Sequence, residues 1–403
     1  MVLPFRKTLF WIHLVVGLVV GLVVALMSVT GVAIAFERQV LEWAEAGSRT
    51  VSAPGPNAPR LSLEDLVAKA REAKPDAQVS GITVFPSETA AVQVALGRAG
   101  VVFVNPYTGA VRESDAKGWR SFFQVMTEWH RWVSMAGDNR PVGKAITGAC
   151  NAGFLFLALS GLYLWWPRKW TLKTVRPVLW FRRGLKGKPR DFNWHNVIGF
   201  WTLPVLIVLT ASGMVISYKW ASDFVYTLTG NTPPAQQGPG SAGVKVTPPT
   251  EDAPRKDLGS MLGVVEEQTP AWTSITYRVP SPPREAKGGK PDAAVDAVTF
   301  NLKQDGWPYF ATTQVSVNPF SGEVARSEGY AEFNSGRKVR TWLRFLHTGE
   351  ALGWPGQLIA AIASLGGVFL VWTGFALSWR RFFPKRQPRD TVASPSGTPE
   401  ASA

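Results

Sequence analysis

The stretch Leu9–Phe36 reads LFWIHLVVGLVVGLVVALMSVTGVAIAF and contains no Asp, Glu, Lys or Arg. A helix of this length is long enough to cross the roughly 30 Å of hydrocarbon in a bilayer. Similar runs recur later in the chain, each apolar around the whole helix, which soluble helices rarely are. The four runs are Leu9–Phe36, Ala145–Trp166, Val197–Ile216 and Leu358–Leu377. The sequence therefore predicts four membrane spans.

Positive charge is concentrated in three short pieces of the chain. Residues 167–192 hold nine Lys or Arg against one acid, and the other pieces are Arg6 with Lys7 and the segment after Trp379. Together they carry about +13 of the formal net charge of +14. The positive-inside rule places them in the cytoplasm, so we expect a bacterial inner-membrane protein with both termini cytoplasmic and two long periplasmic segments. Topology thus explains the pI of about 10.0, and membrane lipid rather than nucleic acid is the expected partner.

The two long segments contain the same motif. Val102–Val111 and Val315–Val324 share the pattern V-x-V-N-P-[YF]-[ST]-G-x-V, which predicts a strand, a tight turn and a second strand. A helical stretch and an alternating, strand-like stretch precede each copy: residues 62–73 and 79–85 in the first, 256–267 and 272–279 in the second. Each long segment is therefore predicted to be a small α+β module.

The spans repeat as well. His13 is followed by Gly17 and Gly31, four and eighteen residues later, and His195 is followed by glycines at the same two distances. Ser160-Gly161-Leu162 in the second span matches Thr373-Gly374-Phe375 in the fourth span. Each unit is a span, an outside module, a histidine-bearing segment and a span. Two spans per unit keep the copies in one orientation, related by an axis along the membrane normal.

The duplication pairs all four histidines of the chain. His13 matches His195 near the cytoplasmic ends of spans, and His130 matches His347 at the outer interface. Ionisable residues in spans are costly and are candidates for function, and two facing imidazoles are suitable axial ligands for haem iron. Zinc would need three or four ligands in one place, and each face offers two histidines without a nearby cysteine, because the single Cys150 lies inside a span. Glu128 or Glu350 could complete such a site at the outer face only. The pattern therefore favours two b-type haems, with all four histidines as iron ligands.

Four glycines are predicted to make space for these haems. Gly161 and Gly374 lie level with the cytoplasmic pair, and Gly31 and Gly213 lie near the outer pair. The eighteen residues from His13 to Gly31 correspond to about 27 Å of helix, so two haems would stack across the bilayer.

We expect an α-helical membrane protein, with a four-helix transmembrane bundle from a tandem duplication and two small periplasmic α+β modules. The expected segments, in order, are span 8–36, module 37–118, outer-interface histidine segment 119–142, span 143–166, basic cytoplasmic loop 167–192, span 193–218, module 219–335, outer-interface histidine segment 336–355, span 356–380 and disordered cytoplasmic tail 381–403.

No motif for a soluble redox cofactor is found in the sequence. It has no G-x-G-x-x-G after a strand, no P-loop and no plausible soluble domain on the cytoplasmic side. A serine or cysteine nucleophile is not expected either, because every histidine is assigned to haem. Electrons are therefore expected from a separate cytoplasmic reductase or from membrane quinol.

The repeated N-P-[YF]-[ST]-G turns resemble the V-D-P-x-T-G turn of PepSY modules. Their placement between the first and second and the third and fourth spans resembles the PepSY-associated, iron-regulated transmembrane proteins. This resemblance covers residues 5–385, and Asn105 and Asn318 stand where the PepSY turn usually has Asp. The family includes inner-membrane ferric-siderophore reductases of the ferrioxamine reductase type, which hold two b-type haems in a four-helix bundle.

The resemblance implies that His13 and His195 ligate the cytoplasmic haem, and that His130 and His347 ligate the outer one. It implies an oxidoreductase that passes electrons to a periplasmic ferric siderophore and releases Fe(II). Candidate contacts of haem propionates or of an anionic chelate are Arg131, Arg340 and Arg344. PepSY modules also occur in non-redox proteins, so the alternative is a transporter subunit or a peptidase-regulating membrane protein.

Overall fold

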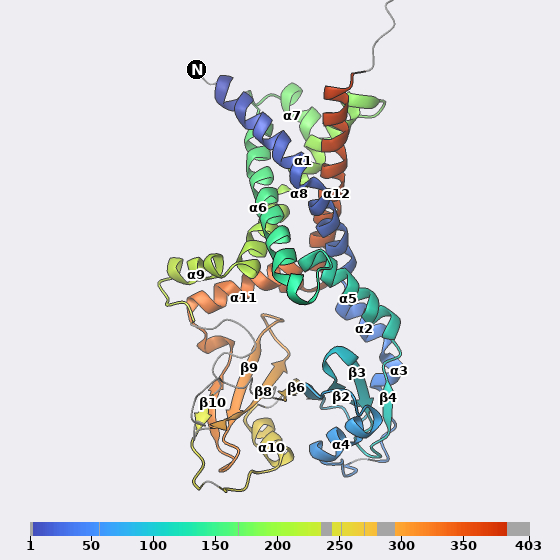
Figure 1. The fold of residues 1–403 in the computed structure, drawn as a ribbon, viewed down its shortest axis with the longest axis vertical. Helices are drawn as coiled ribbons and strands as arrows, with labels where there is room; N and C mark the ends of the chain where they lie inside the picture. The colour runs from blue at the N-terminus through green and yellow to red at the C-terminus, as the bar shows by residue number, and fades with distance from the viewer. Residues whose placement is uncertain are drawn as a thin grey trace, which may run out of the picture.

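The structure, a computed structural model, describes residues 3–55, 57–167, 169–234, 244–250, 252–269, 271–279 and 295–384. A bundle of four long helices stands on a β-sheet domain (Figure 1). The end of the bundle nearer the sheet is called the sheet end. The opposite end, where the first bundle helix begins and the last one finishes, is called the termini end.

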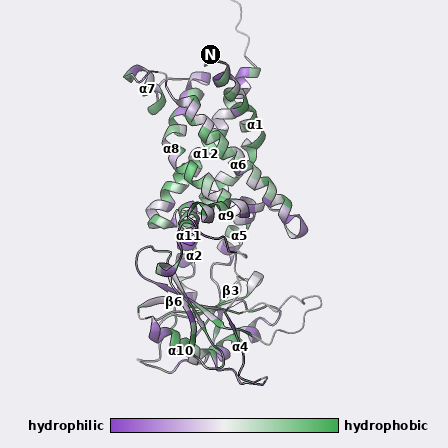
Figure 2. Ribbon diagram, turned by 90° about the vertical axis from the view of Figure 1, so that its left-hand side faces the viewer, coloured by the Kyte–Doolittle hydropathy of each residue, from purple (hydrophilic) through white to green (hydrophobic). Residues whose placement is uncertain are grey.

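The bundle helices are α1 (Leu3–Ile34), α6 (Arg140–Trp165), α8 (Gly187–Ser217) and α12 (Gly353–Phe382). All four are long and apolar enough to cross a membrane, which confirms the predicted number of spans, and Figure 2 shows hydrophobic residues along them. Helices α1 and α8 both pack against α6 and α12. The duplicated partners α1 and α8 therefore lie across the bundle from each other, as do α6 and α12.

The predicted basic loop 167–192 is partly helical. It contains α7 (Leu172–Leu179), and α8 starts at Gly187, six residues before the predicted span. The early start is stabilised by Asp191, whose carboxylate is fully buried and forms ion pairs with Arg190 at 2.8 Å and Arg380 at 2.9 Å. Charged residues near the start of a helix lower its mean hydropathy, so this part of α8 was assigned to the loop. Of the predicted tail 381–403, residues 385–403 lie outside the described residues.

Three shorter helices lie across the sheet end (Figure 1). They are α5 (Lys117–Trp132), α9 (Lys219–Leu228) and α11 (Ser335–Thr348), and α5 and α11 carry the predicted interface histidines. Helix α9 was assigned to the second module, but in the structure it packs against α11. A Cβ on Gly336 would come within 2.5 Å of Tyr226, so this glycine permits the close contact.

Helices α2 (Glu37–Ala44) and α3 (Ala46–Arg49) connect α1 to the sheet domain along α5. Glu45, between them, is fully buried and accepts hydrogen bonds from Arg49 at 2.8 Å, from Ser114 at 2.6 Å and from Arg120. Burial alone would raise the pKa of Glu45, but these hydrogen bonds outweigh it and lower the pKa.

The sheet has eight antiparallel strands drawn from both repeats. In spatial order they are β10 (Val324–Glu328), β9 (Thr312–Val317), β8 (Val298–Gln304), β6 (Trp272–Arg278), β1 (Gly81–Val84), β2 (Val92–Ala95), β3 (Val101–Val104) and β4 (Val111–Glu113). A separate two-stranded ribbon joins β5 (Lys245–Val246) to β7 (Val295–Asp296). Short 3-10 helices span Gly97–Ala99, Gly137–Asn139, Tyr330–Glu332 and Glu350–Leu352.

The two predicted modules form one sheet and one core. Their first strands, β1 and β6, pair antiparallel, with Thr83 opposite Thr276 and their hydroxyls 2.9 Å apart. Helices α4 (Leu63–Ala73) and α10 (Leu258–Gln268) contact each other and bury their apolar side chains in the same cluster. The two predicted modules thus pair through β1 and β6 into one continuous sheet with a shared core, which covers a strand edge that each half would otherwise leave unpaired.

The predicted tight turns are confirmed. The Asn105 side-chain carbonyl accepts from the backbone N–H of Tyr107 at 2.9 Å, and Asn318 does the same for Phe320 at 2.9 Å. Gly109 has φ +72°, as the turn requires. Asparagine thus makes the hydrogen bond that aspartate makes in such turns.

Candidate functional site

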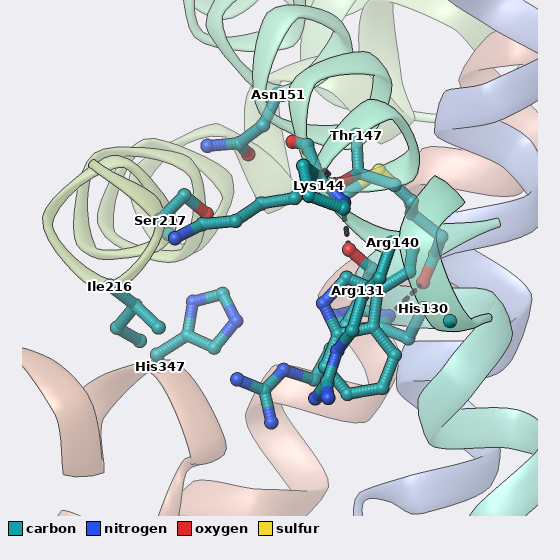
Figure 3. A pocket seen from close by; sticks show the side chains of 14 residues that line it. His130, Arg131, Arg140, Lys144, Thr147, Asn151, Ile216, Ser217 and His347 are labelled. Carbon is teal, nitrogen blue, oxygen red and sulfur yellow. Dashed lines mark hydrogen bonds between the residues drawn. The ribbon is translucent and has the colours of Figure 1, made fainter. Parts of the chain in front are cut away.

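At the sheet end, α5 and α11 bring His130 and His347 together. Their ring centres are 6.3 Å apart. Both line a cavity of about 640 Å³, within the usual range of about 300–1,000 Å³ for cofactor and ligand sites. Figure 3 shows the two imidazoles entering this cavity from opposite sides.

At the termini end, His13 lies on α1 and His195 on α8, the two helices that lie across the bundle from each other. The two histidines are close enough for their charges to interact. The His13 Nδ1 lies 2.8 Å from the Ser160 hydroxyl on α6, and the His195 Nδ1 lies 2.9 Å from the Thr373 hydroxyl on α12. The structure therefore brings together both histidine pairs that the duplication predicted.

Every histidine lies against a hydroxyl residue followed by glycine on a neighbouring bundle helix. The pairs are His13 with Ser160-Gly161, His195 with Thr373-Gly374, His130 with Thr30-Gly31 and His347 with Ser212-Gly213. The hydroxyl contacts Nδ1 in each case, and a Cβ on the glycine would lie 3.3–3.8 Å from the Cε1 of the ring. The predicted glycines thus make room for the imidazoles themselves. The hydroxyl residues precede those glycines in the repeat, but their role was not recognised from sequence.

These contacts determine the tautomer of each imidazole. Each hydroxyl donates its single hydrogen to the carbonyl four residues earlier, as Ser160 does to Phe156 at 2.7 Å and Thr373 to Phe369 at 2.7 Å. A hydroxyl committed in this way can only accept from Nδ1. Nδ1 therefore carries the proton, and Nε2 keeps the lone pair that a metal ion requires.

The sheet-end pair has a second acceptor for Nδ1. The Met27 carbonyl lies 2.9 Å from the His130 Nδ1, and the Leu209 carbonyl lies 2.9 Å from the His347 Nδ1. A carbonyl oxygen has no proton to donate, so the same tautomer follows independently. Within the described ranges, these hydrogen bonds to the four imidazole rings all involve Nδ1.

Burial keeps the sheet-end imidazoles neutral. Desolvation, with smaller contributions from the charges of His347 and Arg131, lowers the pKa of His130 to about 4. Burial also lowers the pKa of His347. Protein surrounds both rings except where they face the cavity. Two neutral imidazoles with free lone pairs thus point into one cavity at neutral pH.

Cations surround the mouth of this cavity. Arg131 lines it as predicted, and so do Arg140 and Lys144 of α6, which sequence reasoning missed (Figure 3). The two arginines lie 4.7 and 3.7 Å from the centre of the Trp132 ring, on which their guanidinium groups pack. Burial and the charges of Arg140 and Arg344 lower the pKa of Arg131.

The other predicted arginines are less close to the cavity. Arg344 lies near Arg131 but is not among the lining residues, and Arg340 donates to the Ser222 hydroxyl on α9 at 2.8 Å. Asn151 lines the cavity and donates to the Thr210 carbonyl at 2.9 Å. Neither Asn151 nor the α6 cations repeat in the second half, so the duplication could not reveal them.

Each end of the bundle offers one pair of histidines. Over the described part of the chain, no three His, Cys, Asp or Glu side chains cluster as a metal site would require. Two imidazoles alone make a poor zinc site but suit a metal that brings its own equatorial ligands.

The family model of the PepSY-associated TM region matches residues 10–381, which include both repeats and all four histidines. The chain belongs to this family. It is therefore a PepSY-associated membrane protein. No curated protein gives a significant match to it.

Proposed function

We propose that this PepSY-associated protein is a dihaem oxidoreductase of the bacterial inner membrane that passes electrons to a periplasmic ferric siderophore and releases Fe(II). His13 and His195 would hold a b-type haem at the termini end, and His130 and His347 a second one at the sheet end. A haem at each position supplies one-electron transfer. The termini end would face the cytoplasm, because the basic pieces of the chain lie there.

The observation that carries the proposal is the geometry of the sheet-end pair. A bond from a metal ion to an imidazole nitrogen is about 2.0–2.1 Å, and the ring centre lies about 1.1 Å further on. The ring centres of His130 and His347 are 6.3 Å apart, so the two imidazoles are close enough for both to hold one metal ion, which would supply one-electron transfer there. Their Nδ1 atoms are already hydrogen-bonded, which leaves Nε2 for the ion.

The remaining residues have defined tasks. The four hydroxyls orient the imidazoles and raise their donor strength, since each accepts a hydrogen bond from Nδ1–H. Eighteen residues of α1, from His13 to Gly31, separate the two ends by about 27 Å. Electrons would enter at the termini end from a cytoplasmic reductase or from quinol. Reduction of Fe(III) weakens its binding to hard oxygen donors, which favours iron release.

Absorption spectra of the purified protein, oxidised and then reduced with dithionite, test the cofactor. We expect about two low-spin, six-coordinate b-type haems per chain. His13→Ala or His195→Ala is expected to remove one haem, and His130→Ala or His347→Ala the other. A colourless protein, or single-His variants that keep both haems with unchanged spectra, would contradict the assignment and favour a non-redox PepSY protein.

Re-oxidation of the reduced protein by a panel of Fe(III) hydroxamates and catecholates, with ferrozine to capture Fe(II), tests the reaction. His130→Ala is expected to abolish transfer. His13→Ala should instead block electron entry from the termini end in proteoliposomes, while a directly reduced sheet-end haem still transfers its electron. If no chelate re-oxidises the protein faster than buffer and oxygen do, the protein has a different electron-transfer role.

A further inference from the structure

The duplication predicts two equivalent sides for the sheet-end cavity. In the structure the two sides differ in the residues that they present. Gly143 and Gly356 occupy matching positions on α6 and α12, where a Cβ would meet the carbonyl of Trp132 at 2.1 Å and of Gly349 at 2.3 Å. The next residue along the chain is Lys144 in the first repeat and Gln357 in the second. Lys144 lines the cavity, whereas Gln357 does not.

At the equivalent place on the second-repeat side the side chains are packed and do not line the cavity. Gln357 is 2% exposed, donates to the Ala35 carbonyl at 2.7 Å and accepts from the Gln39 amide at 2.5 Å. Arg38 and Glu350 form an ion pair at 3.9 Å beside this contact. This place is therefore occupied by the Ala35 carbonyl, the amides of Gln39 and Gln357, and an ion pair without net charge.

On the first-repeat side the cavity is open. The counterpart of Ala35 is Ser217, which lines the cavity with Lys144 (Figure 3). The chain turns away here, because α8 ends at Ser217 and α9 runs outward, whereas α1 is followed by α2 alongside α5.

Among the described residues, the three cations that line the cavity all belong to the first repeat. Arg131, Arg140 and Lys144 are exposed at its mouth, and the corresponding residues of the second repeat are neutral: Thr348, Gly353 and Gln357. Across the described ranges, no carboxylate forms an ion pair with any of these three cations. Like charges held this close without a counter-ion repel one another, so the arrangement favours a bound anion.

We propose that the open side is the acceptor site and that it selects anionic Fe(III) chelates, whose carboxylate or other anionic oxygens contact Arg131, Arg140 and Lys144. This rests on the proposed function. The chelated Fe(III) gains the one electron that the sheet-end cofactor loses and becomes Fe(II); no bond to the protein forms. Haem propionates present the same carboxylate chemistry, so the test must distinguish a chelate from a propionate.

The test compares two chelates of opposite charge: anionic Fe(III)–EDTA and the cationic Fe(III) complex of desferrioxamine B. Re-oxidation of the reduced protein is followed by stopped flow at low and high salt. We expect Lys144→Gln and Arg140→Gln each to slow the anionic chelate about five- to tenfold at low salt, with the effect fading at high salt. The cationic chelate should re-oxidise these two variants as fast as it re-oxidises the wild type, or faster. Lys144→Glu should reverse the preference, so that the cationic chelate reacts faster than the anionic one. Lys69→Gln, on α4 in the sheet domain, is the matched control and should change neither rate.

Haem content and midpoint potential separate the two sources of carboxylate. If Lys144→Gln lowers haem content or shifts the potential, and slows both chelates equally, the cations bind propionates and the acceptor proposal is wrong. Unchanged rates with both chelates would also overturn it.

Binding of Ga(III)–EDTA, which does not accept an electron, keeps this proposal separate from the redox function. The oxidised wild-type protein should bind it, and Lys144→Gln should weaken binding by a similar factor. If neither iron chelate re-oxidises the wild-type protein, the proposed function fails, while the gallium measurement still decides the anion site. Absence of Ga(III)–EDTA binding to the wild type refutes the anion site.

Discussion

The four hydroxyls that accept hydrogen bonds from the histidines predict an asymmetry between the two proposed haem sites. Ser160 is the one acceptor seen for the His13 Nδ1 within the described residues, at 2.8 Å. The His130 Nδ1 has the Thr30 hydroxyl at 3.2 Å and also the Met27 carbonyl at 2.9 Å. Ser160→Ala therefore leaves a buried N–H without a partner, whereas Thr30→Val leaves the shorter of two hydrogen bonds in place.

The expected magnitudes follow from that difference. A buried donor without an acceptor costs about 1–3 kcal/mol, and loss of a hydrogen-bond partner of a metal-bound histidine typically weakens metal binding about 10–100-fold. We expect Ser160→Ala to weaken retention of the termini-end haem in this range. Thr30→Val should cost less than about 1 kcal/mol, or under about fivefold, at the sheet end.

Transfer of haem to excess apomyoglobin would measure both effects. We expect the two proposed haems to leave in separate kinetic phases, which the His13→Ala and His130→Ala proteins would identify. Ser378→Ala is the matched control: its hydroxyl also donates to the carbonyl four residues earlier, Gly374 at 2.8 Å, but contacts no histidine. Haem loss from Ser160→Ala no faster than from this control, or a larger effect of Thr30→Val, would refute the reasoning.

Three further outcomes are expected. Reporter fusions after Arg49 should report the periplasm and fusions after Lys186 the cytoplasm; the reverse pattern would invert the membrane orientation. Ile275→Ala, at a position 1% exposed in the strand that joins the two halves, should cost about 2–5 kcal/mol and lower the midpoint of a single unfolding transition of the sheet domain, whereas two separate transitions would show independent halves. Glu45→Gln should cost about 1–3 kcal/mol at pH 7, measured by thermal unfolding in detergent. Because the pKa of Glu45 is lowered in the folded protein, its contribution is present above pH 4.5 and is lost as pH falls through the folded pKa. The cost of Glu45→Gln should therefore shrink in acid, and an unchanged cost would contradict the lowered pKa.

The sequence alone determined the features that depend on local pattern and on the duplication. Spans follow from the length of apolar runs, which the bilayer thickness sets, and the histidine pairs follow from counting matched positions. The N-P-[YF]-[ST]-G turns follow from Asn105 and Gly109, whose conformations are set within five residues. The haem ligands and the electron acceptor stay predictions.

Only the tertiary structure decided what lies opposite each of these residues. The pairing of Thr83 with Thr276 joins residues far apart in sequence, and no local signal distinguishes a shared sheet from two separate ones. In the sequence Ser160 is an ordinary helix residue. Only the structure shows that its hydroxyl lies beside the His13 ring. Lys144 and Gln357 occupy equivalent positions in the repeat, yet one faces an open cavity and the other is buried against α1, because the two halves leave the bundle in different directions.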